Sequence, residues 1–302
     1  MTPEVVCAGN LLVDDLVFED GRTMMAQAGG ALLHAAHAAA AWGTRVGCVS
    51  VAGTDYPADA LAELEARGAR LDGVVRLPGP GARIWLLYEG AVRQMVHRAG
   101  RPSHAEVSPR PVDVPTAWRG APGLLVAPMP LACQRELVAA AAPGTFVALD
   151  PHEPLSVRSA RAWEAVLAHC DAVFVGDDEL DLPAGDDPIE HIDGIGGHRL
   201  RYIAYKRGAA GGVLYDRHAE ATWTWAAVGT EVVDPTGAGD AFAAGFVSAR
   251  VAGCEVAECL ARGAAAASVA VSARGASALA AVTRGELEAR SARCGVERRD
   301  DR

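Results

Sequence analysis

The sequence predicts an α/β fold with a mostly parallel central sheet, helices on both faces of it, and a small second β-sheet. Three observations support this. Short apolar runs alternate with Ala/Leu-rich stretches of helical period, two segments interrupt that alternation, and the C-terminal part has helical patterns. Strand-helix alternation is typical of parallel sheets, whose ligands bind beyond the carboxyl ends of the strands.

The expected elements follow one another along the chain. Short apolar runs predict buried strands at 5–9, 45–53, 123–129, 145–150, 171–176 and 201–208. Longer stretches with a helical period predict helices at 31–43, 56–69, 131–142, 157–169, 239–251 and 255–272. Gly43 would end the first helix. The polar, Gly-rich stretch 182–198 is expected to be an exposed connection.

Two segments favour antiparallel strands outside the main sheet. Residues 14–28 contain Asp20-Gly21 between extended flanks, a strong hairpin signal, and residues 82–100 contain two strand patterns around Glu89-Gly90. Together they could form a lid over the strand ends, or they could be ordinary surface hairpins. The second segment offers groups suited to a polyol or sugar acid, although aromatic residues at alternate positions also serve packing. These groups are Trp85, Tyr88, Arg93, Gln94 and His97.

Composition limits the classes of partner. The chain has 302 residues, half of them hydrophobic, and a net charge of −10, which argues against nucleic acid as a partner. The seven cysteines are scattered without a C-x-x-C pair, as expected for free thiols in a reducing cytosol. With no apolar run of about 18 residues and no signal-like N-terminus, we expect a cytoplasmic protein that does not contact membranes. Residues 1–295 are expected to form one domain, followed by a charged tail at 296–302.

The stretch EVVDPTGAGDAF (231–242) has the pattern of a strand, a tight turn and the start of a helix. The small residues Gly237, Ala238 and Gly239 would let an anion reach the free N–H groups of the helix N-terminus. Asp240 is either an ordinary first-turn carboxylate or the base of a phosphoryl-transfer site. The motifs of Walker-type, dinucleotide-binding and serine-hydrolase sites are absent, and Lys206 is the only lysine in the sequence.

At this stretch the chain resembles a known family. DPTGAGDAFAAGF (234–246) is similar to the C-terminal signature of the ribokinase-like (PfkB) carbohydrate kinases, D-T-x-G-A-G-D-x-F in its usual form. Gly29-Gly30, Ala36, Gly43 and the AGTD at 52–55 resemble the N-terminal signature, and GNLLVDD (9–15) resembles the first strand and turn. KRGAAGG (206–212) and residues 261–276 are similar to the family's G-x-x-G hairpin and adenine-wall helix. The resemblance spans roughly residues 4–290.

The resemblance implies a three-layer sandwich with a β-sheet lid and transfer of the γ-phosphoryl group of ATP, with Mg²⁺, to a sugar-type hydroxyl. A nucleoside acceptor, or a non-catalytic sugar- or nucleotide-binding regulator, are the alternatives. By position, Asp240 would be the base and Gly237, Ala238 and Gly239 the anion hole. The acceptor would bind at Asp14, Gly29, Gly30 and His34, and the nucleotide at Lys206, Gly208 and Gly211. Glu179 would hold Mg²⁺, directly or through water, and Asp234 and Thr236 lie where some members bind K⁺. A homodimer through the lid is also a family feature.

Two positions depart from the family pattern. His34 stands where the family has an Asn that contacts the acceptor, so pocket shape and pH sensitivity would change, unless His34 only packs its helix. Gly176 replaces the Asn of the N-x-x-E motif. Asp177 or Asp178 could compensate as magnesium ligands or could simply be charges at a helix start. Asp150 ends a strand at the ligand edge of the sheet, but the pattern around it differs from the family and assigns it no role.

Overall fold

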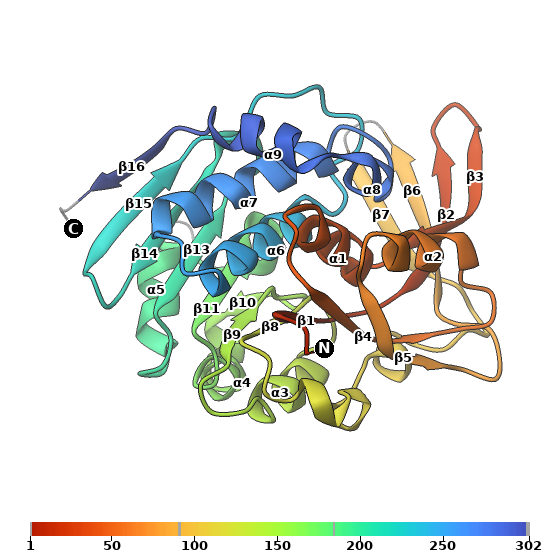
Figure 1. Cartoon of the computed structure of the whole chain (residues 1–302), viewed down its shortest axis with the longest axis horizontal. Helices are drawn as coiled ribbons and strands as arrows, with labels where there is room; N and C mark the ends of the chain where they lie inside the picture. The colour runs from red at the N-terminus through yellow and green to blue at the C-terminus, as the bar shows by residue number, and fades with distance from the viewer. Residues whose placement is uncertain (1, 90–91, 184, 300–302) are drawn as a thin grey trace.

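The computed structural model describes residues 2–89, 92–183 and 185–299. It has three layers, with a ten-stranded sheet between two layers of helices (Figure 1). The seven strands from β5 to β13 in the order below pair in parallel, and the remaining three are antiparallel. The order is β5 (Arg70–Arg76), β4 (Val46–Ala52), β1 (Val5–Ala8), β8 (Gly123–Val126), β9 (Phe146–Leu149), β11 (Ala172–Gly176), β13 (Tyr202–Lys206), β14 (Gly212–Asp216), β15 (Ala221–Trp225) and β16 (Val296–Arg299). The predicted α/β fold class is confirmed.

Helices cover both faces of this sheet and create two apolar cores (Figure 1). One face carries α1 (Ala31–Ala41), α2 (Ala58–Ala66), α6 (Ala238–Val251), α7 (Val256–Ala270), α8 (Ser277–Ala281) and α9 (Arg284–Ser291). The other carries α3 (Leu131–Ala139), α4 (Ala160–Leu167) and α5 (Pro188–Ile195). Strand β1 shows the division: Val5 and Cys7 belong to the first core, while Val6 and Ala8 belong to the second. Successive side chains of a strand point to opposite faces, so an apolar run is buried on both sides.

The lid is a separate four-stranded sheet with the order β3-β2-β6-β7, at the right of Figure 1. It contains β2 (Leu12–Phe18), β3 (Thr23–Gly29), β6 (Arg83–Glu89) and β7 (Val92–His97), all within or next to the two segments expected to form it. Strands β2 and β6 pair in parallel, and the two outer pairs are antiparallel. The turn expected at Glu89-Gly90 lies partly outside the described residues. Two short strands, β10 (Leu155–Ser156) and β12 (Leu180–Asp181), form a third sheet.

The expectation that 182–198 is only an exposed connection was wrong. Pro188–Ile195 form α5, because the side chain of Asp187 accepts hydrogen bonds from the N–H groups of Ile189 and Glu190 at the helix start. Ile189 and Ile192, one helical turn apart, are buried in the second core. A polar and Gly-rich composition hid this short amphipathic pattern.

The expected charged tail at 296–302 was also wrong for its first part. Val296–Arg299 form β16 and pair with β15, and the guanidinium of Arg298 lies 5.9 Å from the ring centroid of Trp223. Strand β15 would otherwise leave its N–H and C=O groups open at the sheet edge, and charged side chains are common on the strands that close such edges. Residues 300–302 lie outside the described part of the chain.

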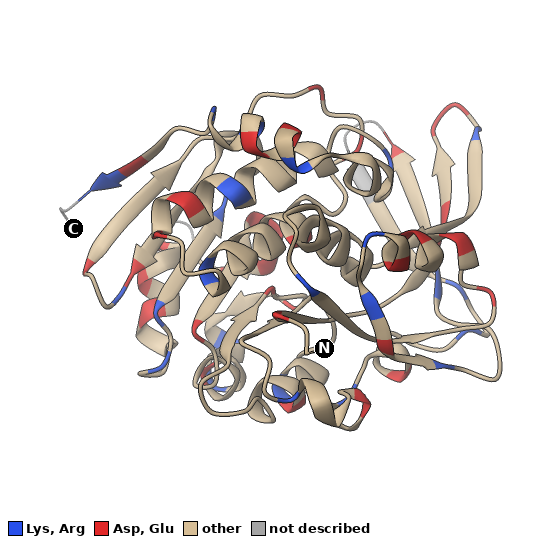
Figure 2. Ribbon diagram, in the orientation of Figure 1, with Lys and Arg blue, Asp and Glu red and all other residues tan. Residues whose placement is uncertain are grey.

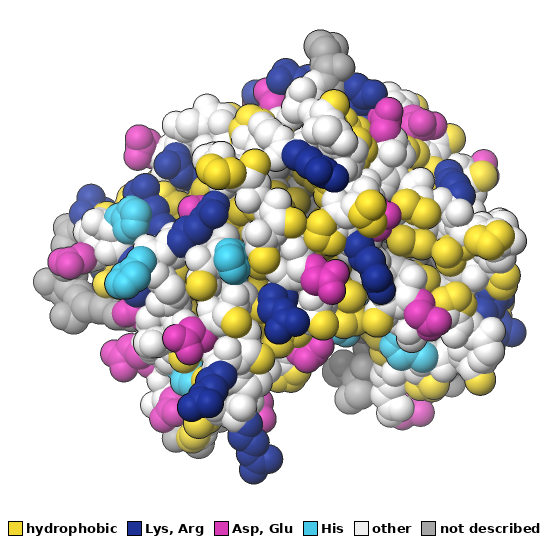
Figure 3. Space-filling view, turned by 90° about the horizontal axis from the view of Figure 1, so that it is seen from below, with side chains coloured by type: hydrophobic (Ala, Val, Ile, Leu, Met, Phe, Trp, Pro, Cys, Tyr) yellow, Lys and Arg dark blue, Asp and Glu magenta, His cyan; other side chains and the backbone are white. Residues whose placement is uncertain are grey.

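Charged side chains are interspersed along the elements, and the face seen from below mixes acidic, basic, histidine and apolar side chains (Figures 2 and 3). Within the described residues, no helix is both long enough and apolar enough to cross a membrane. All seven cysteines are free thiols.

Candidate active site

A cavity of about 840 Å³ lies at the carboxyl ends of the parallel strands, between the lid and the start of α6. Residues that follow five strands reach it: Asn10, Pro128, Asp150, Gly176 and Lys206 stand at or just after the ends of β1, β8, β9, β11 and β13. This is the edge at which ligands bind in parallel sheets. Of the site residues that the family resemblance implies, all except Gly29 and Asp234 line the cavity.

The N-terminus of α6 is the centre of the cavity. Gly237 precedes the helix with a φ of +80°, in the left-handed region that favours glycine, and Asp240 lies in the first turn. A Cβ atom at Gly237 would lie 2.1 Å from the ring of His34, and one at Gly239 would lie 2.9 Å from Nζ of Lys206. The small residues therefore leave room for two neighbouring side chains, and they also expose the positive end of the helix.

Lys206 and Asp150 form a buried ion pair beside that helix end. The Nζ atom of Lys206 lies 2.7 Å from Oδ1 of Asp150. Burial disfavours the ammonium ion, but the carboxylates of Asp150, Glu179 and Asp240 outweigh it and raise the pKa of Lys206. The one lysine of the sequence is thus charged and lies beside the N-terminus of α6. The sequence suggested only that Asp150 ends a strand at the ligand edge; its partner is 56 residues away.

At the lid end of the cavity, Asp14, Gly30 and His34 come together. Gly30 has a φ of +101°, and a Cβ atom there would be 2.2 Å from the carbonyl oxygen of Asn10. His34 is buried, with Nδ1 3.3 Å from the Gly30 carbonyl oxygen. Gly29 lies under the carboxylate of Asp14, which a Cβ atom at Gly29 would meet at 1.9 Å. The four residues proposed for the acceptor therefore adjoin one another.

Sequence reasoning missed several residues at this end. The hydroxyl group of Tyr56 donates to the carbonyl oxygen of Gly29, and Asn10 donates to the carbonyl oxygen of His104 and to Ser108 Oγ. Asn10, His104 and His152 line the cavity. Burial, together with the rings of His152 and His97, lowers the pKa of His104 to about 4, so His104 is neutral at pH 7. Among these residues, the sequence offered a signal only for Asn10, a polar residue that follows a predicted strand and therefore stands at the ligand edge of the sheet.

The lid presents an apolar wall to the cavity. Leu12, Ile84, Leu86 and Met95 line it, with Asp14 as the carboxylate among them. Of the two roles considered for the lid aromatics, Trp85 has the packing role, because Ile84 and Leu86 point to the cavity and Trp85, between them, points to the other face of the sheet. There the guanidinium of Arg98 lies 5.2 Å from its ring centroid.

Three other lid residues named from the sequence, Tyr88, Gln94 and His97, are not among the residues that line the cavity. Tyr88 stacks on Phe18 and its hydroxyl group lies 3.4 Å from Oδ2 of Asp234, while the ring of His97 packs edge-on against His104. Gln94 is exposed, and the side chain of Arg93 lies outside the described part of the chain.

The carboxylates proposed for metal ions lie on both sides of the helix end. Glu179 lines the cavity and accepts a hydrogen bond from the N–H of Gly176, and Asp177 accepts one from the hydroxyl group of Tyr205. Asp234 is buried beside the cavity and accepts a hydrogen bond from the N–H of Thr236. Among the described residues, no three His, Cys, Asp or Glu side chains form a cluster able to hold a metal ion alone. The residues fit Mg²⁺ that is carried by phosphate groups and keeps most of its water.

The opposite end of the cavity is lined by α7 and the strands after Lys206. Gly208 and Gly211 stand in the turn between β13 and β14. Ala264, Ala267 and Ser268 of α7, with Val271 directly after it, line the cavity at the segment that the sequence suggested as a wall for adenine. Trp225 and Val228 complete an apolar slot at this end.

Comparison with known proteins gives a family match over most of the chain. The sequence profile of the pfkB family carbohydrate kinases matches residues 3–283. A cytidine kinase from Thermococcus kodakarensis is 27% identical over 263 residues, which are 85% of this chain and 92% of that protein.

Two solved structures resemble the whole chain. The ribokinase of Arabidopsis thaliana, complexed with ribose and ATP, has a TM-score of 0.74 at 21% identity and covers 96% of this chain and 99% of its own. The nucleoside kinase of Methanocaldococcus jannaschii has a TM-score of 0.73 at 17% identity, with 97% and 99% covered. At these identities the structural likeness concerns the fold.

Proposed function

Because the chain belongs to the pfkB family of carbohydrate kinases, we propose that it transfers the γ-phosphoryl group of ATP to a hydroxyl group of a nucleoside, with Asp240 as general base. One observation carries the proposal. The helix end with Asp240 stands in a single cavity between Asp14, Gly30 and His34 on one side and Lys206, Gly208 and Gly211 on the other. A phosphoryl group could therefore pass directly from a nucleotide on the second side to an acceptor on the first.

In the proposed reaction, Asp240 accepts the proton of the acceptor hydroxyl group. The hydroxyl oxygen then bonds to the γ-phosphorus atom while the bond from that atom to the β,γ-bridging oxygen breaks, which releases ADP. The N–H groups of Gly237, Ala238 and Gly239 and the ammonium group of Lys206 stabilise the negative charge on the phosphate oxygens. Asp150 keeps Lys206 charged and in place.

Two ions are part of the proposal. Mg²⁺ would neutralise charge on the ATP phosphates, and Glu179, directly or through water, would hold it. Asp234 and Thr236 are the proposed residues for K⁺ next to the helix end, although the Asp234 carboxylate already accepts the Thr236 N–H. Neither ion changes the assignment of Asp240.

The lid wall supports a nucleoside as acceptor. A ribose would meet the polar groups of Asp14 and His34, and a flat base would lie against Leu12, Ile84, Leu86 and Met95. The name of the Thermococcus kodakarensis relative points the same way. A free sugar is the second candidate, because Asn10, Asp14 and the neutral His104 provide several hydrogen-bonding groups in the same cavity.

The test is ADP release from Mg-ATP over panels of nucleosides, sugars, sugar acids and polyols, with Asp240→Asn as the blank. We expect turnover with a nucleoside and a loss of about 10²–10⁴-fold in kcat in the variant, with ATP binding unchanged. Turnover with sugars alone would show that the acceptor is a sugar and not a nucleoside. If Asp240→Asn keeps most of its kcat, Asp240 is not the general base. ATP binding without turnover of any acceptor would favour a non-catalytic regulator.

A further inference from the structure

We propose that Asp15 is a positioning residue for the acceptor: its buried carboxylate joins the strands of the lid and thereby holds its neighbour Asp14 in the cavity. The proposal rests on the assignment of Asp14 to the acceptor made above. It concerns the face of the lid opposite to the cavity, to which the proposed reaction gives no role.

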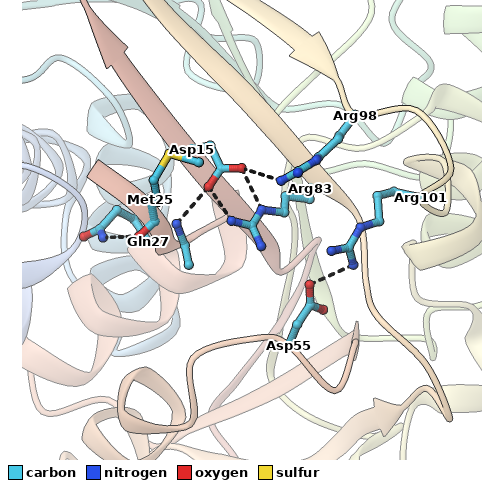
Figure 4. A network of polar contacts seen from close by, with 8 residues as sticks. Asp15, Met25, Gln27, Asp55, Arg83, Arg98 and Arg101 are labelled. Carbon is cyan, nitrogen blue, oxygen red and sulfur yellow. Dashed lines mark hydrogen bonds and ion pairs between the residues drawn. The ribbon is translucent and has the colours of Figure 1, made fainter. Parts of the chain in front are cut away.

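The Asp15 carboxylate makes four contacts, and each comes from a different lid atom (Figure 4). Arg83 of β6 binds it with two nitrogens, Nε at 2.7 Å from Oδ2 and Nη2 at 2.6 Å from Oδ1. Arg98, just after β7, donates from Nη1 at 3.1 Å, and the N–H of Ala26 in β3 donates at 2.8 Å. One side chain of β2 thus contacts β3, β6 and the end of β7.

The electrostatic environment explains why this side chain can be buried. The side chain of Asp15 is 0% exposed, and burial alone would raise its pKa. The hydrogen bonds of Arg83 and Ala26 and the charges of Arg83 and Arg98 outweigh burial and lower the pKa of Asp15. Since a buried carboxylate without these partners is costly, the arginines and Asp15 depend on one another.

The network also holds an irregular backbone beside Asp14. The pairing of β2 with β3 shifts between Asp14 and Leu16, where β3 has one extra residue. At this bulge Ala26 has a φ of +56°, a left-handed conformation that is unfavourable for a residue with a side chain. The Asp15 carboxylate accepts the N–H of Ala26 itself. Bulges redirect nearby side chains, and this one is one residue from Asp14.

Asp14 and Asp15 point to opposite faces of the lid. Asp14 lies in the cavity with Ile84, its neighbour in β6, while Asp15 pairs with Trp85 on the outer face. A slip of one residue would exchange the two faces and would move Asp14 out of the cavity. In the observed register Asp15 lies on the same face of the lid as Arg83, the partner of Val13, so its ion pairs stabilise the register that places Asp14 at the acceptor.

A second carboxylate, that of Asp55, binds the two ends of the β6–β7 hairpin. Asp55 accepts the N–H of Gly81, just before β6, and pairs with Arg101, which follows β7, at 2.8 Å (Figure 4). Asp55 follows β4 of the central sheet, so its contacts attach both ends of the β6–β7 hairpin to that part of the molecule. The contacts of Asp15 connect the strands within the lid itself.

The experiment compares Asp15→Asn with the wild-type protein. Asn keeps an oxygen for the Ala26 N–H but loses the charge that binds the two arginines. We expect the acceptor KM to rise about ten- to hundredfold while the KM for ATP changes less than about twofold. The control is Asp20→Asn at the tip of the β2–β3 hairpin, where the Asp20–Arg22 pair is exposed; it should leave both KM values unchanged.

Three further measurements keep the test decisive. Asp14→Asn reports on the proposed function: if it leaves the acceptor KM unchanged, the acceptor site itself is wrong, whereas an effect of Asp14→Asn without one of Asp15→Asn refutes only the positioning role. If Asp15→Asn does not fold, Arg98→Gln takes its place, because the side chain of Arg98 is 39% exposed and its replacement disturbs the fold less. Amide hydrogen exchange in β2 and β3 requires no acceptor. It should accelerate at least tenfold in either variant, with the central sheet unchanged, and unaltered exchange in the lid would overturn the proposal.

Discussion

The imidazole ring of His34 lies directly against the α-carbon of Gly237, so close that a Cβ atom at Gly237 would be 2.1 Å from Cδ2 of the ring. His34 belongs to α1 on the acceptor side, and Gly237 precedes α6 on the phosphate side. The contact joins the two halves of the proposed reaction, and it involves the one position of the N-terminal signature that departs from the family pattern.

Gly237→Ala should therefore be damaging for two separable reasons. The left-handed φ costs a residue with a Cβ atom about 1–2 kcal/mol, and the added methyl group displaces His34. We expect a lower free energy of unfolding by urea and a lower kcat. Combining the change with His34→Asn, which has a smaller side chain, should relieve the steric part. Strict additivity of the two substitutions in a double-mutant cycle would show that the contact is not energetically coupled.

His34→Asn alone should affect the acceptor more than the nucleotide. The ring fills space beside Gly30 and Gly237, and the smaller amide changes the shape and the hydrogen bonding of the acceptor end. Steady-state kinetics should show an acceptor KM that changes at least severalfold more than the KM for ATP. Equal changes in both would place His34 outside acceptor recognition.

Gly176→Ala should change the requirement for Mg²⁺. A Cβ atom at this position would lie 2.7 Å from Oε2 of Glu179, the oxygen that now accepts the Gly176 N–H. The carboxylate must move, so half-maximal activity should need a severalfold higher concentration of Mg²⁺ at constant ATP. Gly194→Ala is the matched control, because a Cβ atom there meets open space. If the concentration of Mg²⁺ for half-maximal activity does not change, Glu179 does not bind the metal ion.

Stability should fall as the pH decreases below neutrality, in part because of His37. Burial, the guanidinium of Arg67 and the ring of His34 lower the pKa of His37 to about 4 from its usual 6.5. Between these values the unfolded chain binds the extra proton, so the free energy of unfolding decreases as the pH falls. Between pH 7 and pH 5 this one group accounts for roughly 2 kcal/mol of the loss.

Urea unfolding of His37→Leu at both pH values measures that contribution. The variant should lose less stability than the wild-type protein on going from pH 7 to pH 5, whatever its stability at pH 7. The same substitution at the exposed His198 is the control, for which we expect the wild-type difference. If His37→Leu also shows the full wild-type loss, His37 is not protonated on unfolding in this range.

Much of the architecture could be predicted because it is written in local patterns. The apolar runs at β1, β4, β8 and β11 and the helical periods of α1, α6 and α7 each lie within a continuous stretch. The turn residues Asp20-Gly21 likewise identified a lid hairpin. The short helix α5 and the edge strand β16 were missed, since polar and charged residues carry few such patterns and tertiary contacts decide their structure.

For the site, the sequence alone determined a helix start with small residues and a first-turn carboxylate, because Gly237, Ala238, Gly239 and Asp240 are contiguous. Only the tertiary structure decided which distant side chains meet there. The pairing of Asp150 with Lys206 requires β9 and β13 to end at the same edge of the sheet, and the opposite orientations of Asp14 and Asp15 require one register of the lid strands. Strand order and register are global properties: a shift of one residue reverses every side chain, yet leaves the local pattern of the sequence unchanged.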